Sequence, residues 1–184
     1  MNFRSAIIYR RTVDRMEIVM KCLCFSDSHG TSAGMRRALS MHPDAEVVFF
    51  LGDGLTDVEE LIYDRRRSWI AVRGNCDYIG SVGDVLVKKT DSITLMGRRI
   101  LLTHGDIYGV KGGLDGIMAL AVDRNADIVL FGHTHQPLEK YIPTESGGYY
   151  LFNPGSIGNG FRGSISYGVI NITEQGILLS HGYF

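Results

Sequence analysis

This 184-residue chain has almost no net charge and few cysteines. Its 19 Lys and Arg nearly balance its 20 Asp and Glu, so the total charge indicates neither nucleic acid nor a membrane surface as a partner. The three cysteines, Cys22, Cys24 and Cys76, are an odd number and lack the spacing of a zinc site. This count argues against a disulfide framework and favours a reducing, cytoplasmic location.

Long apolar runs are absent as well. No stretch approaches the roughly 18 apolar residues of a membrane span, and Ile7-Ile8-Tyr9 is too short for the apolar part of a signal peptide. Met20-Lys21 leads directly into the first predicted strand. We therefore expect residues 1–19 to be an N-terminal extension, either an arm or a mis-assigned start, and 20–184 to be a single domain. An ordered arm would favour a homo-oligomer.

Apolar runs alternate with amphipathic segments in the first part of the chain, which indicates an α/β fold with parallel strands and right-handed crossovers. The predicted strands are 21–26, 45–51, 69–72, 85–87, 92–96, 99–103 and 127–131, and the predicted helices are 31–42, 57–65 and 114–124. Gly97-Arg98 is expected to form a two-residue hairpin turn. The last third, 138–184, is strand-rich and predicts an antiparallel meander.

Five of the apolar strands end in a small residue beside Asp, Asn or His. The residues at these ends are Asp27, His29, Asp53, Asn75, His104, His133 and His135. One such ending would be an ordinary turn, but five of them carry four of the six histidines. Because ligands bind at the carboxyl ends of parallel strands, these side chains are predicted to meet at one edge of a sheet.

Imidazole and carboxylate donors without thiolate suit Mn²⁺, Fe²⁺, Ni²⁺, Co²⁺ or Zn²⁺. Seven ligands are too many for one catalytic metal that keeps an open position, and they suit two metals about 3.5–4 Å apart. Asp53 stands alone after the middle strand and is therefore the natural bridging carboxylate. His133 and His135 lie two residues apart at a strand exit, so both imidazoles are expected on one side.

The order of these motifs resembles that of the calcineurin-like metallophosphoesterase superfamily, in particular its small YfcE-type phosphodiesterases. The motifs are Asp27-Ser28-His29, Gly52-Asp53, Gly74-Asn75-Cys76-Asp77, His104-Gly105, Gly132-His133-Thr134-His135 and Asn153-Pro154-Gly155-Ser156. The resemblance covers residue 21 onward. It implies an αββα fold, in which helices flank a two-sheet β-sandwich with the metals at strand carboxyl ends.

The resemblance also implies a metal-dependent phosphodiesterase acting on a small phosphodiester. One metal would be held by Asp27, His29 and His135 and the other by Asn75, His104 and His133, with Asp53 bridging them. Mn²⁺ is the expected metal, with Ni²⁺, Fe²⁺, Co²⁺ and Zn²⁺ as alternatives. A hydroxide held between the two metals would attack phosphorus, and Asn75 and His133 would act as catalytic residues by stabilising charge on the non-bridging oxygens.

Cys76 departs from the wider superfamily, where many members carry a His that assists the leaving group. A thiol is a poor general acid toward an alkoxide, so activated leaving groups such as phenols are expected. The neighbouring Asp77 either contacts Arg73 or a backbone donor structurally or takes part in the reaction. The segment 153–156 is expected to support the His133–His135 turn, the alternative being that its backbone N–H groups bind a substrate phosphate. Arg162 is interpreted as a solvated loop cation, the alternative again being contact with a substrate phosphate.

Two other functions stay open at this point. One is a non-catalytic protein-binding scaffold, like the retromer subunit that shares this fold, which should bind metal weakly or at one site. The other is a phosphomonoesterase or nuclease of the same superfamily. Arg65-Arg66-Arg67 is interpreted as a solvated helix end, so no nucleic-acid groove is indicated.

Overall fold

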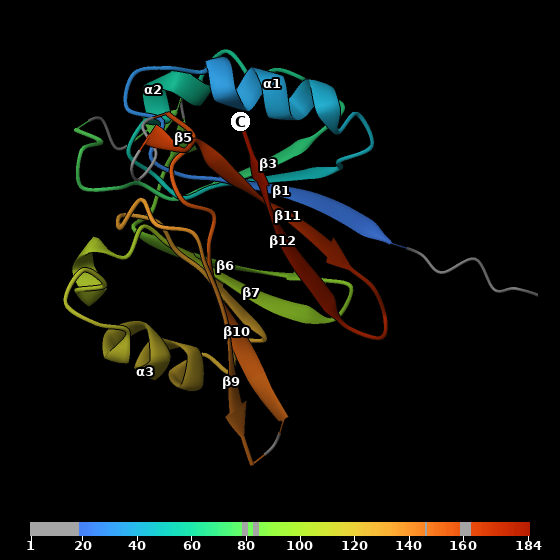
Figure 1. Cartoon of the computed structure of the whole chain (residues 1–184), viewed down its shortest axis with the longest axis vertical. Coiled ribbons are helices and arrows are strands. Elements are labelled where there is room, and N and C mark those ends of the chain that lie inside the picture. The colour runs from blue at the N-terminus through green and yellow to red at the C-terminus, as the bar shows by residue number, and fades with distance from the viewer. Residues whose placement is uncertain (1–18, 79–80, 83–84, 146, 159–162) are drawn as a thin grey trace, which may run out of the picture.

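The computed structural model describes residues 19–184 except 79–80, 83–84, 146 and 159–162. Two mixed sheets of five strands each, flanked by few helices, make up this part of the chain (Figure 1). No helix in these ranges is long and apolar enough to cross a membrane. The predictions for residues 1–18 and for Arg162 lie outside the described residues.

The first sheet has the strand order β12-β11-β1-β2-β3. Its strands are β1 (Met20–Phe25), β2 (Val47–Phe50), β3 (Ser68–Ala71), β11 (Ser166–Ile172) and β12 (Ile177–Tyr183). β1, β2 and β3 are parallel, because α1 (Ala33–Met41) and α2 (Leu55–Val58) return the chain between them. β11 pairs antiparallel with both β1 and β12. The carboxyl ends of β1, β2 and β3 therefore lie at the same edge.

The second sheet has the order β6-β7-β8-β10-β9. Its strands are β6 (Thr90–Leu95), β7 (Arg98–Thr103), β8 (Ile128–Leu130), β9 (Leu138–Thr144) and β10 (Gly147–Asn153). β7, β8 and β10 are parallel, and α3 (Asp115–Asp123) lies between β7 and β8 in the chain. A short 3₁₀ helix, η1 (Asp106–Tyr108), follows β7, and the two-stranded hairpin of β4 (Ser81–Val82) and β5 (Val85–Leu86) precedes β6.

β2 and β8 are buried along their whole length, and β1 and β7 over their last four residues, which explains why these sequences are continuous apolar runs rather than alternating ones. In β1, Cys22 and Cys24 point into the core between the two sheets, whereas Leu23 and Phe25 point to the helical side. Ile100 and Leu102 of β7 meet the first sheet in the same inner core. The two cysteine thiols are thus packed core groups.

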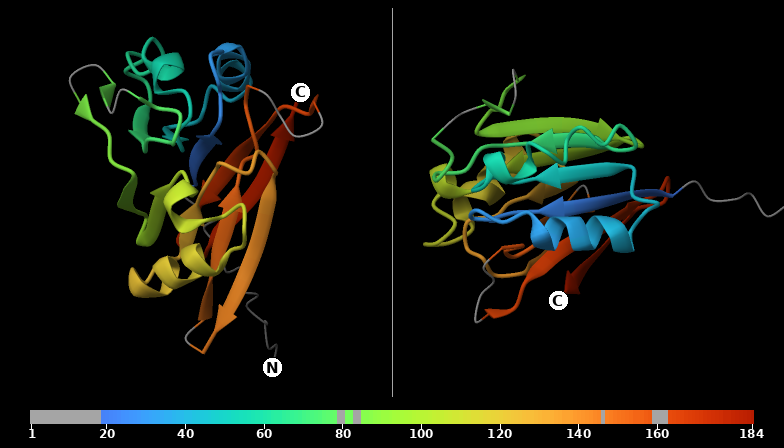
Figure 2. Two further views of the ribbon diagram at one scale, coloured as in Figure 1. Left: turned by 90° about the vertical axis from the view of Figure 1, so that its left-hand side faces the viewer. Right: turned by 90° about the horizontal axis from the view of Figure 1, so that it is seen from above.

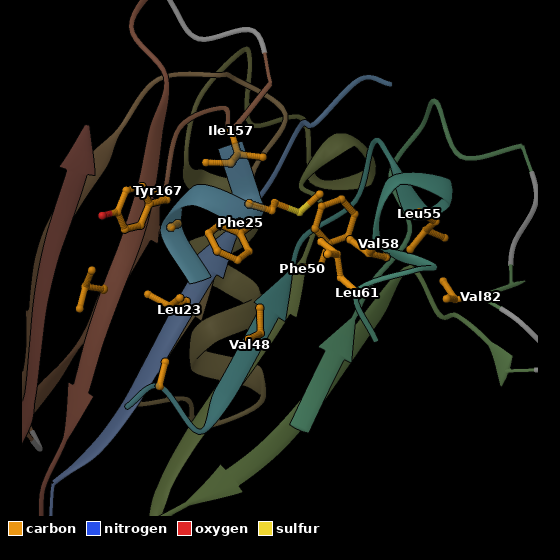
Figure 3. Close-up of a cluster of buried hydrophobic side chains, with 14 of the residues drawn as sticks. Leu23, Phe25, Val48, Phe50, Leu55, Val58, Leu61, Val82, Ile157 and Tyr167 are labelled. Carbon is orange, nitrogen blue, oxygen red and sulfur yellow. The ribbon is translucent and has the colours of Figure 1, made fainter. Parts of the chain in front are cut away.

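Each outer face of the sandwich carries helices. Figure 3 shows Phe25 and Phe50 packed beneath α1 and α2, and Leu101 and Val129 of the second sheet pack against α3. In the left view of Figure 2, α1 (blue, top) and α3 (yellow, lower left) lie on opposite sides of the stack. The αββα sandwich that the resemblance implies is confirmed.

Four predictions are wrong. The helix predicted at 57–65 is instead α2, which ends at Val58, because the N–H groups of Leu61 and Asp64 donate to the carbonyl three residues back, Val58 O (2.8 Å) and Leu61 O (3.2 Å), and so form turns. The side chain of Arg67 is 4% exposed and donates to the carbonyls of Leu39 and His42, so it is not a solvated helix end.

The other two errors concern strand connections. The β6–β7 turn is Met96-Gly97, one residue earlier than predicted, and both residues have positive φ (47° and 76°), as a type I′ turn requires. The last third of the chain is not one meander. It forms two hairpins in different sheets, β9–β10 in the second and β11–β12 in the first, because long-range packing decides which sheet each hairpin joins.

Candidate metal centre

The predicted site residues lie together where strands of both sheets end. Asp27 and His29 follow β1, Asp53 follows β2, Asn75 follows β3, His104 follows β7, and His133 and His135 follow β8. Backbone bonds join neighbouring loops: the Asp27 N–H donates to Gly52 O (3.0 Å), and the Gly132 N–H donates to His104 O (3.0 Å). Two facing sheets thus contribute to the cluster, whereas the strand pattern predicts one sheet edge.

Asp27, His29 and His135 form the first group. The Nε2 atoms of His29 and His135 are 3.1 Å apart, and they lie 3.8 Å and 3.2 Å from Asp27 Oδ1. Each residue offers one donor atom, and these three atoms lie within 4.8 Å of one another. Three converging donors of this kind could hold one metal ion.

Asp53, His104 and His133 form the second group. His104 Nε2 lies 3.3 Å from Asp53 Oδ2, 3.1 Å from His133 Nδ1 and 3.2 Å from Asn75 Oδ1. The other ring nitrogen of His104, Nδ1, lies 2.9 Å from the carbonyl oxygen of Leu51. That contact directs Nε2 toward the cluster, as an outer hydrogen bond commonly does for a metal-binding histidine.

The donor chemistry of both groups fits divalent metals. Asp27 Oδ1 is buried and has no hydrogen-bond partner among the described residues, although leaving a carboxylate oxygen uncompensated is costly. It faces ring nitrogens of His29, His135 and His104 within 3.9 Å. Two pairs of imidazole nitrogens face each other at 3.1 Å. A cation between such acceptors satisfies all of them, and imidazole with carboxylate suits first-row divalent metals.

The backbone of the cluster is unusual. Seven described residues other than glycine have positive φ, and five of them are predicted site residues: Asp27 (57°), His29 (46°), Asp53 (59°), His133 (68°) and His135 (58°). Residues other than glycine rarely adopt this region, and those that do gather at functional sites.

Neighbouring charges shift the pKa values of the second group. Burial raises the pKa of Asp53, but its hydrogen bond with His104 and the charge of His104 outweigh that effect and hold the pKa well below its usual range. Burial lowers the pKa of His104, and the contacts with Asp53 and Asp27 more than offset it, so the net shift is upward. The pKa of His133 is lowered by burial and by the charge of His104, which favours a neutral imidazole able to bind metal.

Asp77 holds two site loops through its carboxylate. It accepts N–H groups from Asp53 (2.8 Å), Gly54 (2.8 Å), Leu55 (2.9 Å) and Gly74 (2.7 Å). The alternative of a structural contact with backbone donors is therefore confirmed, and Asp77 ties the Asp53 loop to the Asn75 loop.

The segment 153–156 supports the histidine turn, as expected. Asn153 Nδ2 donates to Gly132 O (2.9 Å) and Thr134 Oγ1 (3.1 Å), and Ser156 Oγ donates to Asp27 O (2.7 Å). Sequence reasoning missed Asp57, which accepts the Ser28 hydroxyl (2.6 Å) and the Gly30 N–H (2.8 Å) and so fixes the loop that carries His29. Its contacts bridge distant residues, and no motif spacing marks it.

Cys76 lies beside the cluster, at a hollow of roughly 380 Å³ that His29, Asp53 and the exposed Tyr78 also line. Its N–H donates to Asp53 Oδ1 (2.7 Å), and its Sγ accepts a bond from Asn75 Nδ2 (3.2 Å). Burial and then contact with Asp53 raise the pKa of the Cys76 thiol to about 11. The donor atoms of His29, Asp53 and Cys76 also lie within 4.8 Å of one another, so a third grouping of donors includes the thiol.

Comparison with known proteins identifies relatives of the chain. A family model described as the calcineurin-like phosphoesterase superfamily domain matches residues 20–175. The probable metallophosphoesterase YsnB of Bacillus subtilis is 32% identical over 138 residues, which is 75% of each chain. The phosphodiesterase YfcE of Escherichia coli K12 is 29% identical over 175 residues, which cover 83% of this chain and 88% of that protein.

Solved structures of similar fold include a phosphoesterase and a vacuolar protein sorting protein. The phosphoesterase YfcE from E. coli superimposes with a TM-score of 0.63 at 25% identity, over 89% of this chain and 98% of that one. Vacuolar protein sorting 29 from Cryptosporidium parvum gives a TM-score of 0.70 at 13% identity, over 91% of this chain and 99% of that one. The second likeness shows the fold alone.

Proposed function

The chain belongs to the calcineurin-like phosphoesterase superfamily, and from that premise we propose that it is a phosphodiesterase that uses two divalent metal ions. The observation that carries the proposal is the pair of donor groups, Asp27 with His29 and His135, and Asp53 with His104 and His133. Family membership supports hydrolysis of phosphate esters with divalent metals. The pair of metals, Mn²⁺ as their identity and a diester as the substrate are proposals.

The first metal is assigned to Asp27, His29 and His135, and the second to Asn75, His104 and His133. Asp53 is assigned as the bridging ligand, since its carboxylate lies within 4.8 Å of donor atoms of His29, from the first group, and of His104 and His133, from the second. When bound, such a pair of metals supplies a hydroxide at neutral pH and offsets charge on the phosphoryl oxygens.

The residues of this chain orient and stabilise the reacting group. Asn75 is exposed beside the cluster, and its amide Nδ2 is a donor that can move from Cys76 Sγ to a phosphoryl oxygen. His133 is half-buried beside it, and its backbone N–H donates to Asp27 Oδ2 (3.1 Å), which fixes the turn that presents its imidazole to the cluster. Donors preorganised in this way stabilise charge that develops in the transition state.

No described residue replaces the histidine that assists the leaving group in many superfamily members. Without metal, burial and contact with Asp53 raise the pKa of the Cys76 thiol to about 11, and a thiol is a poor general acid toward an alkoxide. Esters of phenols and other good leaving groups are therefore the expected substrates.

Hydrolysis of bis(p-nitrophenyl) phosphate by Mn²⁺-reconstituted protein tests the proposal, with p-nitrophenyl phosphate as the monoester comparison. We expect the diester to be the better substrate and Asp53→Asn and His133→Ala to abolish its hydrolysis. His42→Ala is the matched control, because His42 contacts Tyr167 away from the cluster and should leave turnover unchanged. Hydrolysis that persists in both site variants contradicts the proposal, and metal uptake without hydrolysis of either ester favours the scaffold alternative.

A further inference from the structure

Lys89 lies on the connection that carries the chain from the first sheet to the second, between β5 and β6. The backbone around it contacts both sheets: the Arg73 N–H donates to Lys88 O (2.9 Å), and Thr103 Oγ1 donates to Lys89 O (3.3 Å). Lys89 therefore stands between the loop that follows β3 and the loop that follows β7.

The ammonium group of Lys89 joins those two loops. Nζ donates to the carbonyl oxygen of Gly74 (3.1 Å) and to Asp106 Oδ2 (2.8 Å). Gly74 immediately precedes Asn75, and Asp106 lies two residues after His104. The side chains of Lys89 and Asp106 are 31% and 15% exposed, so this ion pair is more protected than an ordinary surface pair.

Asn75 needs such support because its own side chain is exposed. Packing does not hold it, so apart from the bond of its Nδ2 to Cys76 Sγ (3.2 Å), the position of its Oδ1 beside His104 Nε2 (3.2 Å) depends on the backbone that carries it. The Gly74 N–H is bound by Asp77, and the Gly74 carbonyl is bound by Lys89. The N–H and the carbonyl of Gly74, the residue before Asn75, are thus both held by side chains.

We propose that Lys89, anchored by Asp106, is a positioning residue that holds Asn75 in place to bind the second metal together with His104. The inference rests on the proposed function, because it assigns Asn75 as a metal ligand. Lys89 acts only through the Gly74–Asn75 backbone.

The sign of its effect on metal affinity separates positioning from simple electrostatics. Removing a cation near a metal site, and leaving the Asp106 carboxylate unpaired, should by charge alone strengthen the binding of Mn²⁺. Loss of positioning should weaken it instead. Partners that orient metal ligands commonly contribute about 10–100-fold in affinity, so we expect Lys89→Met to weaken one of two Mn²⁺ sites by about that factor.

Calorimetric titration of metal-free protein with Mn²⁺ measures the affinity of both metal sites in the wild type and in each variant. Lys88→Met is the matched control, since the neighbouring Lys88 pairs with Asp91 at the surface and is 67% exposed. Lys89→Arg should restore part of the affinity because it can still bridge Gly74 and Asp106. Asp106→Asn, which keeps a neutral acceptor for Lys89, should give a smaller loss and serves if Lys89→Met does not fold.

Unchanged or tighter Mn²⁺ binding in a folded Lys89→Met protein overturns the inference, as does an equal loss in Lys88→Met. Diester hydrolysis by the wild type is measured separately. A wild type that binds two Mn²⁺ ions but hydrolyses no ester removes the proposed function, while the affinity comparison still decides the role of Lys89. A wild type that binds fewer than two ions overturns both.

Discussion

Gly74→Ala is the substitution that most directly tests how the candidate bridging carboxylate is packed. A Cβ at residue 74 would lie 2.0 Å from Asp53 Oδ1 and 2.6 Å from the Asp53 backbone nitrogen, and real Cβ contacts essentially never fall below 3.0 Å. The φ of Gly74 is not positive, so the conflict is one of space and not of backbone strain. Relief requires a movement of about 1 Å by the Asp53 carboxylate or by the loop.

Forcing a methyl group into such a site commonly costs about 1–3 kcal/mol. For a domain of this length that corresponds to a fall in Tm of about 2–12 °C. The displaced Asp53 should also lose its contacts with His104 and the Cys76 N–H, so Mn²⁺ affinity should fall with stability.

The assay compares the Tm of Gly74→Ala, Gly176→Ala and wild type in chelator, followed by Mn²⁺ titration. Gly176→Ala is the matched control, because its Cβ meets no atom within 4 Å and its φ is not positive; it should leave both measurements close to wild type. If Gly74→Ala matches Gly176→Ala in Tm and in metal affinity, the reasoning about Asp53 is refuted.

Three further predictions follow from the site. Asp77→Asn should lower the free energy of unfolding by about 2–4 kcal/mol in urea titrations, because an amide nitrogen would face two of the four N–H donors. Asp127→Asn is the control, because the Asp127 carboxylate accepts one backbone N–H, that of Arg99, and its free energy of unfolding should fall by less than half as much. His133→Ala should lose more turnover in steady-state assays than His135→Ala, because only His133 is assigned beside the phosphoryl group, and equal losses would contradict that division. In metal-free protein at pH 8, iodoacetamide should alkylate only the exposed Cys76. The reaction should be roughly tenfold slower than that of an ordinary thiol, because a pKa of about 11 leaves little thiolate. Mass spectrometry measures the rate of alkylation, and a rate equal to that of an ordinary thiol would exclude the raised pKa.

Much of the site is predictable from sequence because each polar residue directly follows an apolar strand. The strand ends at Asp27, Asp53 and Asn75 belong to parallel neighbours, so their convergence needs only the βαβ pattern. The contribution of His104 and His133 from a facing sheet does not follow from that pattern. Only the family resemblance implies a second sheet here, since periodicity identifies strands but not the sheet to which each belongs.

The supporting residues were harder to predict. Asp57 and Lys89 are ordinary charged residues in sequence, and their roles arise from contacts 27 and 15 residues away along the chain. The pattern of Val58 and Leu61 correctly places both in the core, but it does not show that turns replace the helix after Val58, nor that Asp57 and Lys89 make these long-range contacts. Tertiary contacts of this kind leave no local signal.

Anomalous diffraction from crystals of the protein grown with Mn²⁺ tests the central claim most directly. The account predicts two peaks about 3.5–4 Å apart, one beside Asp27, His29 and His135 and the other beside Asn75, His104 and His133, with Asp53 between them. A single peak, or one held by His29, Asp53 and Cys76, would contradict it.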